Sequence, residues 1–112
     1  MRIAVIGGLE RHESEITRRG AQAGHTVEFH RGRVGGRHAE ELEAIVERSD
    51  LSVIVTEVNS HGAVLIAKRA ANRTGRSSLI VRTCGPSRFQ LIIDALQQRP
   101  QANQLAQMVG GC

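Results

Sequence analysis

The segment at residues 51–63, LSVIVTEVNSHGA, decides how this chain folds. Residues 51–56 form a short run rich in β-branched residues, which is typical of a strand buried on both faces of a parallel sheet. A polar turn, Asn59-Ser60-His61, follows it and begins a helix pattern. In α/β proteins the carboxyl end of such a strand is where ligands bind. The segment therefore predicts a central strand, a helix, and a candidate site at the turn between them.

The same strand–helix unit recurs on both sides of this segment. Short apolar runs predict strands, and amphipathic patterns predict helices. The expected strands are residues 2–6, 26–30, 51–56 and 78–82, and the expected helices are residues 9–23, 38–48, 60–72 and 88–97. Four such units in a row predict an α/β fold, a small doubly wound, flavodoxin- or Rossmann-like parallel sheet of about four strands with helices on both faces. We expect the strand order 2-1-3-4.

Length and composition predict one soluble domain, residues 1–98, and a C-terminal tail, residues 99–112. Of the 112 residues, 40% are apolar and 23% are charged, and no run approaches the length that spans a bilayer. The two cysteines, Cys84 and Cys112, imply no disulfide framework, so a cytoplasmic location is expected. Aromatic residues make up only 2% of the chain, which argues against modules that stack nucleic-acid bases.

The charge of the chain allows two interpretations. The net charge is +4, and fourteen of the fifteen basic residues are arginine, the residue suited to bidentate recognition of carboxylate or phosphate. An anionic partner and a merely solvated surface are both consistent with this composition, and only a local cluster distinguishes them.

The strand-to-helix loops supply such a cluster. Right-handed crossovers place all four of these loops on one edge of the sheet. They carry or border four of the five histidines, Cys84 and six arginines, beside helix N-termini that favour anions. The glycine pair Gly7-Gly8 lacks the G-x-G-x-x-G and Walker patterns, so a tight turn is the simplest interpretation of these two residues. The candidate binding residues are Gly7, Gly8, His30, Arg31, Arg33, Asn59, Ser60, His61, Arg82 and Cys84.

Three of these residues, His30, His61 and Cys84, have side chains that indicate specific chemistry. His30 and His61 are each compatible with a simple hydrogen-bonding role, but together they are candidate metal or haem ligands, or one is an acid–base. Their spacing matches no zinc motif. Arg82 and Arg88 would lower the pKa of the Cys84 thiol. Because the phosphatase and C-x-x-C patterns are absent, a buried or half-exposed thiol is favoured over a nucleophile.

Several short motifs resemble the bacterial family known as domain of unknown function 2325, over roughly residues 2–96. The matching elements are Val5-Ile6-Gly7-Gly8, His30 with Gly32, Asp50-Leu51, Asn59-Ser60-His61, Lys68 and Arg82. The resemblance supports the fold and the choice of site residues. This chain has Arg31 where the family often has Asp, and Gly62 where the family usually has an acidic residue. Both differences remove negative charge from the expected site.

These observations favour a non-enzymatic ligand-binding or sensor domain of a bacterial cytoplasmic protein. Haem is the leading cofactor, with imidazole as axial ligand and arginines pairing its propionates, and a divalent metal is second. The alternative is an enzyme acting on a phosphorylated or carboxylated small molecule, with His61 as acid–base and Arg82 as clamp. A third hypothesis is nucleic-acid binding through the loop from Arg31 to Arg37. Exposed sheet edges also predict a homodimer.

Overall fold

The computed structural model describes residues 1–97 and contains the predicted alternation of strands and helices. The strands are β1 (Arg2–Ile6), β2 (Thr26–His30), β3 (Leu51–Val55) and β4 (Ser77–Val81). The helices are a 3₁₀ turn η1 (Glu10–His12), α1 (Glu13–Gln22), α2 (His38–Arg48), α3 (His61–Thr74) and α4 (Pro86–Leu96). The predicted tail, residues 99–112, lies outside the described residues.

The four strands form one parallel sheet in the order β2-β1-β3-β4, which confirms the predicted topology. Ile6 at the end of β1 is in register with His30 of β2 and with Ile54 of β3. The last residues of these strands therefore lie at one level. This edge carries all four strand-to-helix loops.

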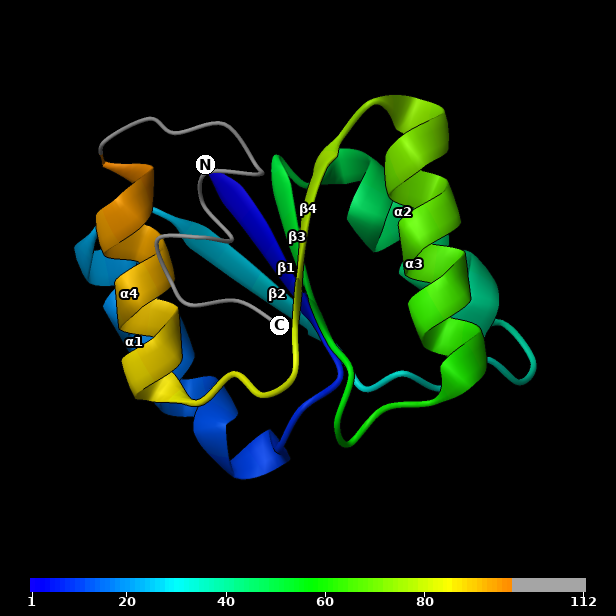
Figure 1. Cartoon of the computed structure of the whole chain (residues 1–112), viewed down its shortest axis with the longest axis horizontal. Helices are drawn as coiled ribbons and strands as arrows, with labels where there is room; N and C mark the ends of the chain where they lie inside the picture. The colour runs from blue at the N-terminus through cyan, green and yellow to red at the C-terminus, as the bar shows by residue number, and fades with distance from the viewer. Residues whose placement is uncertain (98–112) are drawn as a thin grey trace.

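Helices cover both faces of the sheet, as Figure 1 shows, with α1 and α4 on one side and α2 and α3 on the other. Alternate residues of β3 enter the two cores, with Val53 and Val55 packing beside Phe89 of α4 and Ile54 packing with Leu42 of α2. Every residue of β3 is buried because this strand is central and covered on both faces. The doubly wound α/β fold is thus confirmed.

Some element boundaries differ from those predicted. The helix expected over residues 9–23 is divided into η1 and α1, and Leu9 stays outside with 40% of its surface exposed. The helix expected from Arg88 begins instead at Pro86, because the fixed φ of proline suits the first turn of a helix. β4 occupies residues 77–81 rather than 78–82. None of the helices in residues 1–97 is long and apolar enough to cross a membrane.

Candidate functional site

Asn59 joins the carboxyl ends of the two central strands. Its side-chain amide donates to the backbone oxygens of Val55 (2.7 Å) and Ile6 (3.3 Å), while its Oδ1 accepts from the Ser60 amide (2.8 Å). β1 and β3 meet at the point where the order of the sheet reverses, which is the crevice that α/β proteins use for ligands. Asn59 therefore occupies that crevice with bonds to the protein itself.

The glycine turn after β1 is also held by internal hydrogen bonds. The Gly7 amide donates to the His30 backbone oxygen (2.7 Å), and the Gly8 amide donates to the Val58 oxygen (2.9 Å). Gly7 has φ +86°, and a Cβ added to it would lie 2.6 Å from Asn59 Nδ2. Glycine is required here by both backbone conformation and space. The turn joins three loops rather than leaving its amides free for a phosphate.

Ser60 links the β2–α2 loop, residues 31–37, to the beginning of α3. Its Oγ accepts from the Ala63 amide (3.1 Å), which caps α3, and its hydroxyl donates to the Gly32 backbone oxygen (2.6 Å). Gly32 has φ +83°, and a Cβ there would lie 1.9 Å from Asn59 Oδ1. The predicted site residues Asn59 and Ser60 thus lie at the expected edge, where they hold loops together.

His30 is buried at the end of β2, with 8% of its surface exposed. Its Nδ1 accepts from the Gly32 amide (3.0 Å), and its Nε2 lies 3.1 Å from the backbone oxygen of His38. Since an amide only donates and a carbonyl only accepts, the proton of this imidazole belongs on Nε2. Burial lowers the pKa of His30 below its usual range, against the opposing effect of the bond to the His38 carbonyl. A neutral imidazole at neutral pH follows.

His38 and Glu41 bring two more donor atoms to His30. They lie three residues apart at the start of α2 and so share one face of the helix, with His38 Nδ1 3.4 Å from a Glu41 carboxylate oxygen. The rings of His30 and His38 are 6.4 Å apart and nearly perpendicular. One ligand atom from each of the three residues lies within 4.8 Å of the others. We call His30, His38 and Glu41 the histidine cluster.

A hollow of about 200 Å³ lies beside the histidine cluster at the end of β2. Its lining residues are Phe29, His30, Arg31, Arg33, His38 and Glu41. His30, Arg31 and Arg33 were predicted as site residues from the sequence, whereas His38 and Glu41 were not predicted as donors. Their i,i+3 spacing at the first turn of a helix that follows a histidine-ended strand was the available signal.

The other predicted ionic residues are arranged differently. Arg31 forms ion pairs with Glu10 (2.6 Å) and Glu13 (3.9 Å), and Arg82 pairs with Glu57 (2.7 Å). These arginines are therefore partly neutralised by neighbouring carboxylates. His61 is exposed at the first residue of α3 and is not a member of the histidine cluster.

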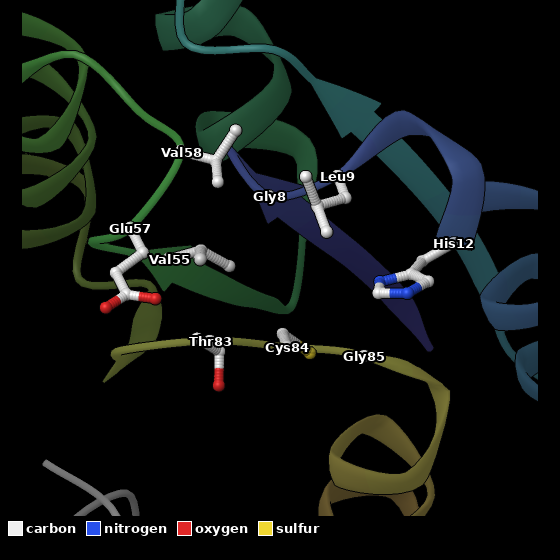
Figure 2. Close-up of a pocket in the computed structure, with 9 residues that line it drawn as sticks. All are labelled: Gly8, Leu9, His12, Val55, Glu57, Val58, Thr83, Cys84 and Gly85. Atoms are coloured by element: carbon white, nitrogen blue, oxygen red, sulfur yellow. The ribbon is translucent and has the colours of Figure 1, made fainter.

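A second, apolar hollow of about 90 Å³ lies between the loops that follow β1, β3 and β4. Figure 2 shows Leu9 and Val58 on one side of it and the segment with Cys84 and Gly85 on the other. Val58 has φ +50°, a conformation unusual for a β-branched residue. The residue is held there while its carbonyl accepts the Gly8 amide.

Cys84 corrects one expectation from the sequence. The thiol is buried, with 6% of the residue exposed, and burial raises its pKa to about 11 although the charge of Arg88 acts in the opposite direction. The prediction that Arg82 and Arg88 would lower this pKa was wrong, because loss of hydration outweighs the effect of Arg88. The preference for an inert buried thiol agrees with this result.

Comparison with known proteins adds a family match. The family model described as "Uncharacterized protein conserved in bacteria (DUF2325)" matches residues 2–96. No curated protein and no solved structure matches the chain.

Proposed function

The chain belongs to this DUF2325 family of bacterial proteins, and we propose that it is a non-enzymatic ligand-binding or sensor domain that holds one divalent transition-metal ion in the histidine cluster. The observation that carries the proposal is the convergence of two imidazoles and one carboxylate, with ligand atoms all within 4.8 Å. Two histidines and a glutamate are a donor set that zinc and similar ions accept, with a further position open to water or another ligand.

The geometry is close to that of a bound ion. Zinc with nitrogen and oxygen ligands at about 2.0–2.1 Å holds them roughly 3.4 Å apart in a tetrahedron. His38 Nδ1 and a Glu41 carboxylate oxygen already have this separation, since they lie 3.4 Å apart. All three ligand atoms lie within 4.8 Å of one another, so the donors need to approach further to coordinate one ion. The lowered pKa of His30 supports binding, because the neutral imidazole is the form that coordinates a metal.

The arginines beside the cluster favour an anionic co-ligand. Arg31 is paired with Glu10 and Glu13, so its charge opposes a cation less than that of a free guanidinium. Arg33 is exposed and lines the same hollow. A carboxylate or phosphate on the open position of the ion would lie next to this guanidinium. The proposal thus joins the predicted metal and the predicted small anionic ligand in one site.

Haem is the other histidine-ligated cofactor that the sequence favours. Pockets that enclose organic ligands of drug size measure about 300–1,000 Å³, whereas the hollow beside His30 measures about 200 Å³. Glu41 also lines it, and its carboxylate would repel the haem propionates. Haem would require a second wall, such as the partner copy of the expected homodimer. We therefore favour a single ion.

The test is titration of the metal-free protein with Zn²⁺ by calorimetry and with Co²⁺ by visible absorption. We expect one ion per chain and the intense absorption of low-coordinate cobalt. His38→Ala and Glu41→Gln should each weaken binding about tenfold or more. Both side chains are substantially exposed, so these variants should fold. Glu40→Gln and His61→Ala are matched controls, since neither residue belongs to the cluster.

Binding that is absent, or equal in the wild type and in His38→Ala, would overturn the proposal. Loss of binding in His61→Ala would instead restore His61 as a ligand with His30. A Soret band on titration with haem, retained in the presence of excess zinc, would favour the haem hypothesis over the ion.

The two remaining hypotheses have less support. For an enzyme, His61 would be the acid–base, but it is exposed at the start of α3, and its expected clamp Arg82 pairs with Glu57. An activity lost in His61→Ala would support it. For nucleic-acid binding, the exposed Arg33 and Arg37 would contact phosphates, and affinity would then fall steeply with salt.

A further inference from the structure

We propose that the ion bound by the histidine cluster acts as a switch, because coordination by His30 breaks the hydrogen bond that holds Gly32 and so releases the β2–α2 loop. This inference rests on the proposed metal-binding function. It deepens that function by naming what the ion changes in the protein.

The inference follows from the valence of the two ring nitrogens. In the metal-free protein Nδ1 accepts the Gly32 amide at 3.0 Å, and Nε2 carries the proton facing the His38 oxygen at 3.1 Å. If the ion binds Nδ1, the lone pair that accepted the Gly32 amide is used for coordination. If the ion binds Nε2, the proton of the neutral ring moves to Nδ1, which then faces the Gly32 amide as a second donor. The Gly32–His30 hydrogen bond is lost in both cases.

Gly32 cannot absorb this change alone, because its carbonyl and its α-carbon are also held. Its carbonyl accepts the Ser60 hydroxyl at 2.6 Å, and that hydroxyl caps the first turn of α3. Its α-carbon is packed so closely that a Cβ would lie 1.9 Å from Asn59 Oδ1. Displacement of the Arg31–Gly32 peptide away from His30 moves the α-carbon of Gly32 and so disturbs the contact between the β2–α2 loop and α3.

The tip of the β2–α2 loop also contacts α3. A Cβ built on Gly62, in the first turn of α3, would lie 3.5 Å from Val34, which shows that the tip of the loop contacts this turn. The loop also presents Arg33 and Arg37 to solvent. Release of Gly32 thus changes the position of a basic, exposed loop relative to the centre of the sheet edge. Binding of a partner to this loop would therefore depend on whether the ion is bound.

The test measures amide hydrogen exchange by NMR in the full-length protein, with and without stoichiometric Zn²⁺. We expect exchange of the Gly32 amide to accelerate about tenfold on binding, as for loss of one hydrogen bond. The nitrogen chemical shifts of the His30 ring should change at the same zinc concentration. The Gly7 amide is the internal control, because it donates to the backbone of His30 rather than to its ring.

The outcomes separate this inference from the proposed function. If Zn²⁺ does not bind, the proposed function fails, and the switch fails with it. If Zn²⁺ binds one per chain and the Gly32 amide keeps its protection, the metal site stands and the switch is overturned. His38→Ala, which lacks a ligand, should leave the Gly32 amide protected at the zinc concentration that releases it in the wild type.

A second measurement tests the link to α3 by reciprocity. Ser60→Ala removes the partner of the Gly32 carbonyl, so less must be broken when the ion binds, and zinc affinity should rise severalfold. Thr74→Val is the matched control, since the Thr74 hydroxyl bonds Ala70 at the other end of α3. Equal zinc affinity in Ser60→Ala and the wild type would overturn the extension of the switch to α3.

Discussion

Single residues at the sheet edge owe their chemistry to burial as much as to their type. His30 and Cys84 lie close to arginines in the sequence, yet burial is the main cause of the pKa shift of each. Burial disfavours the charged form, so the imidazole stays neutral and the thiol stays protonated. The neutral imidazole of His30 suits the metal-ligand role that we propose for it, whereas the protonated thiol of Cys84 is a poor nucleophile.

Cys84 should react slowly with thiol reagents in the native protein. A rise of its pKa to about 11 lowers the thiolate fraction about 100-fold at pH 8, and the side chain is buried besides. The measurement is the rate of reaction with a disulfide reagent in a Cys112→Ser background, which leaves one thiol. The same protein in urea supplies the rate of the exposed thiol. Equal rates in buffer and urea would contradict the burial of Cys84.

At the scale of elements, the strands and helices are connected at one edge by side chains that the loops share. Asn59 contacts the ends of β1 and β3, and Ser60 joins the β2–α2 loop to α3. Gly32 lies between them, where no larger residue fits. The elements are packed by their apolar faces, but the arrangement of the loops depends on these few polar contacts.

Gly32→Ala should lower the free energy of unfolding by about 3 kcal/mol, because it adds both a left-handed backbone penalty and a clash with Asn59. Gly36→Ala is the matched control, since Gly36 also has a positive φ but a Cβ there meets nothing within 4 Å. It should cost about 1 kcal/mol. Urea denaturation measures both values.

The clash can be separated from the backbone penalty with a second substitution. In an Asn59→Ala background the obstructing Oδ1 is absent, so Gly32→Ala should cost about 1 kcal/mol less than in the wild type. Strict additivity of the two substitutions would show that Asn59 does not determine the conformation of the β2–α2 loop.

At the scale of the whole molecule, two histidines make stability depend on pH. Burial lowers the pKa of His30, and burial together with the N-terminal amino group lowers that of His25. The unfolded chain then binds more protons than the native protein below about pH 6.5. The stability that these neutral rings contribute is present above this pH and is lost as the pH falls.

We therefore expect the free energy of unfolding of the metal-free protein to decrease from pH 7.5 to pH 5. Urea denaturation in the presence of a chelator measures it at both values. His30→Gln and His25→Gln should each reduce the difference, whereas His61→Gln, at an exposed position, is the control. A decrease that is the same in all four proteins would assign the pH dependence to other groups.

The predicted fold was correct because its causes are local or general. Residues 51–56 were predicted as a buried strand from their β-branched run, and β3 covers residues 51–55 of this range. Four repeats of the strand–helix pattern imply a parallel sheet with its loops on one edge. The predicted ends of the helices and strands were less accurate than the predicted fold. The exposed Leu9 and the proline at the start of α4 shifted two boundaries by small local effects.

The candidate site was predicted only in part. The edge and His30 followed from the topology, because any strand of a parallel sheet delivers its last residue to that edge. His38 and Glu41 were missed as donors, although their spacing placed them on one helix face. Whether they reach His30 depends on the path of the β2–α2 loop, which follows from the positive φ of Gly32 and its bonds to His30 and Ser60.

The sequence by itself determined the α/β architecture and the edge of the sheet that gathers histidines and arginines, since hydrophobic periodicity and the handedness of crossovers suffice for these. The strand order was expected by likeness to flavodoxin-like sheets, and the structure confirms it. The tertiary structure alone decided which of those side chains bond within the protein and which lie together in the histidine cluster. Asn59 and Ser60 bond to other loops, Arg31 and Arg82 pair with carboxylates, and His30 lies beside His38 and Glu41. Such pairings depend on hydrogen bonds between segments far apart in the chain, which no local pattern specifies.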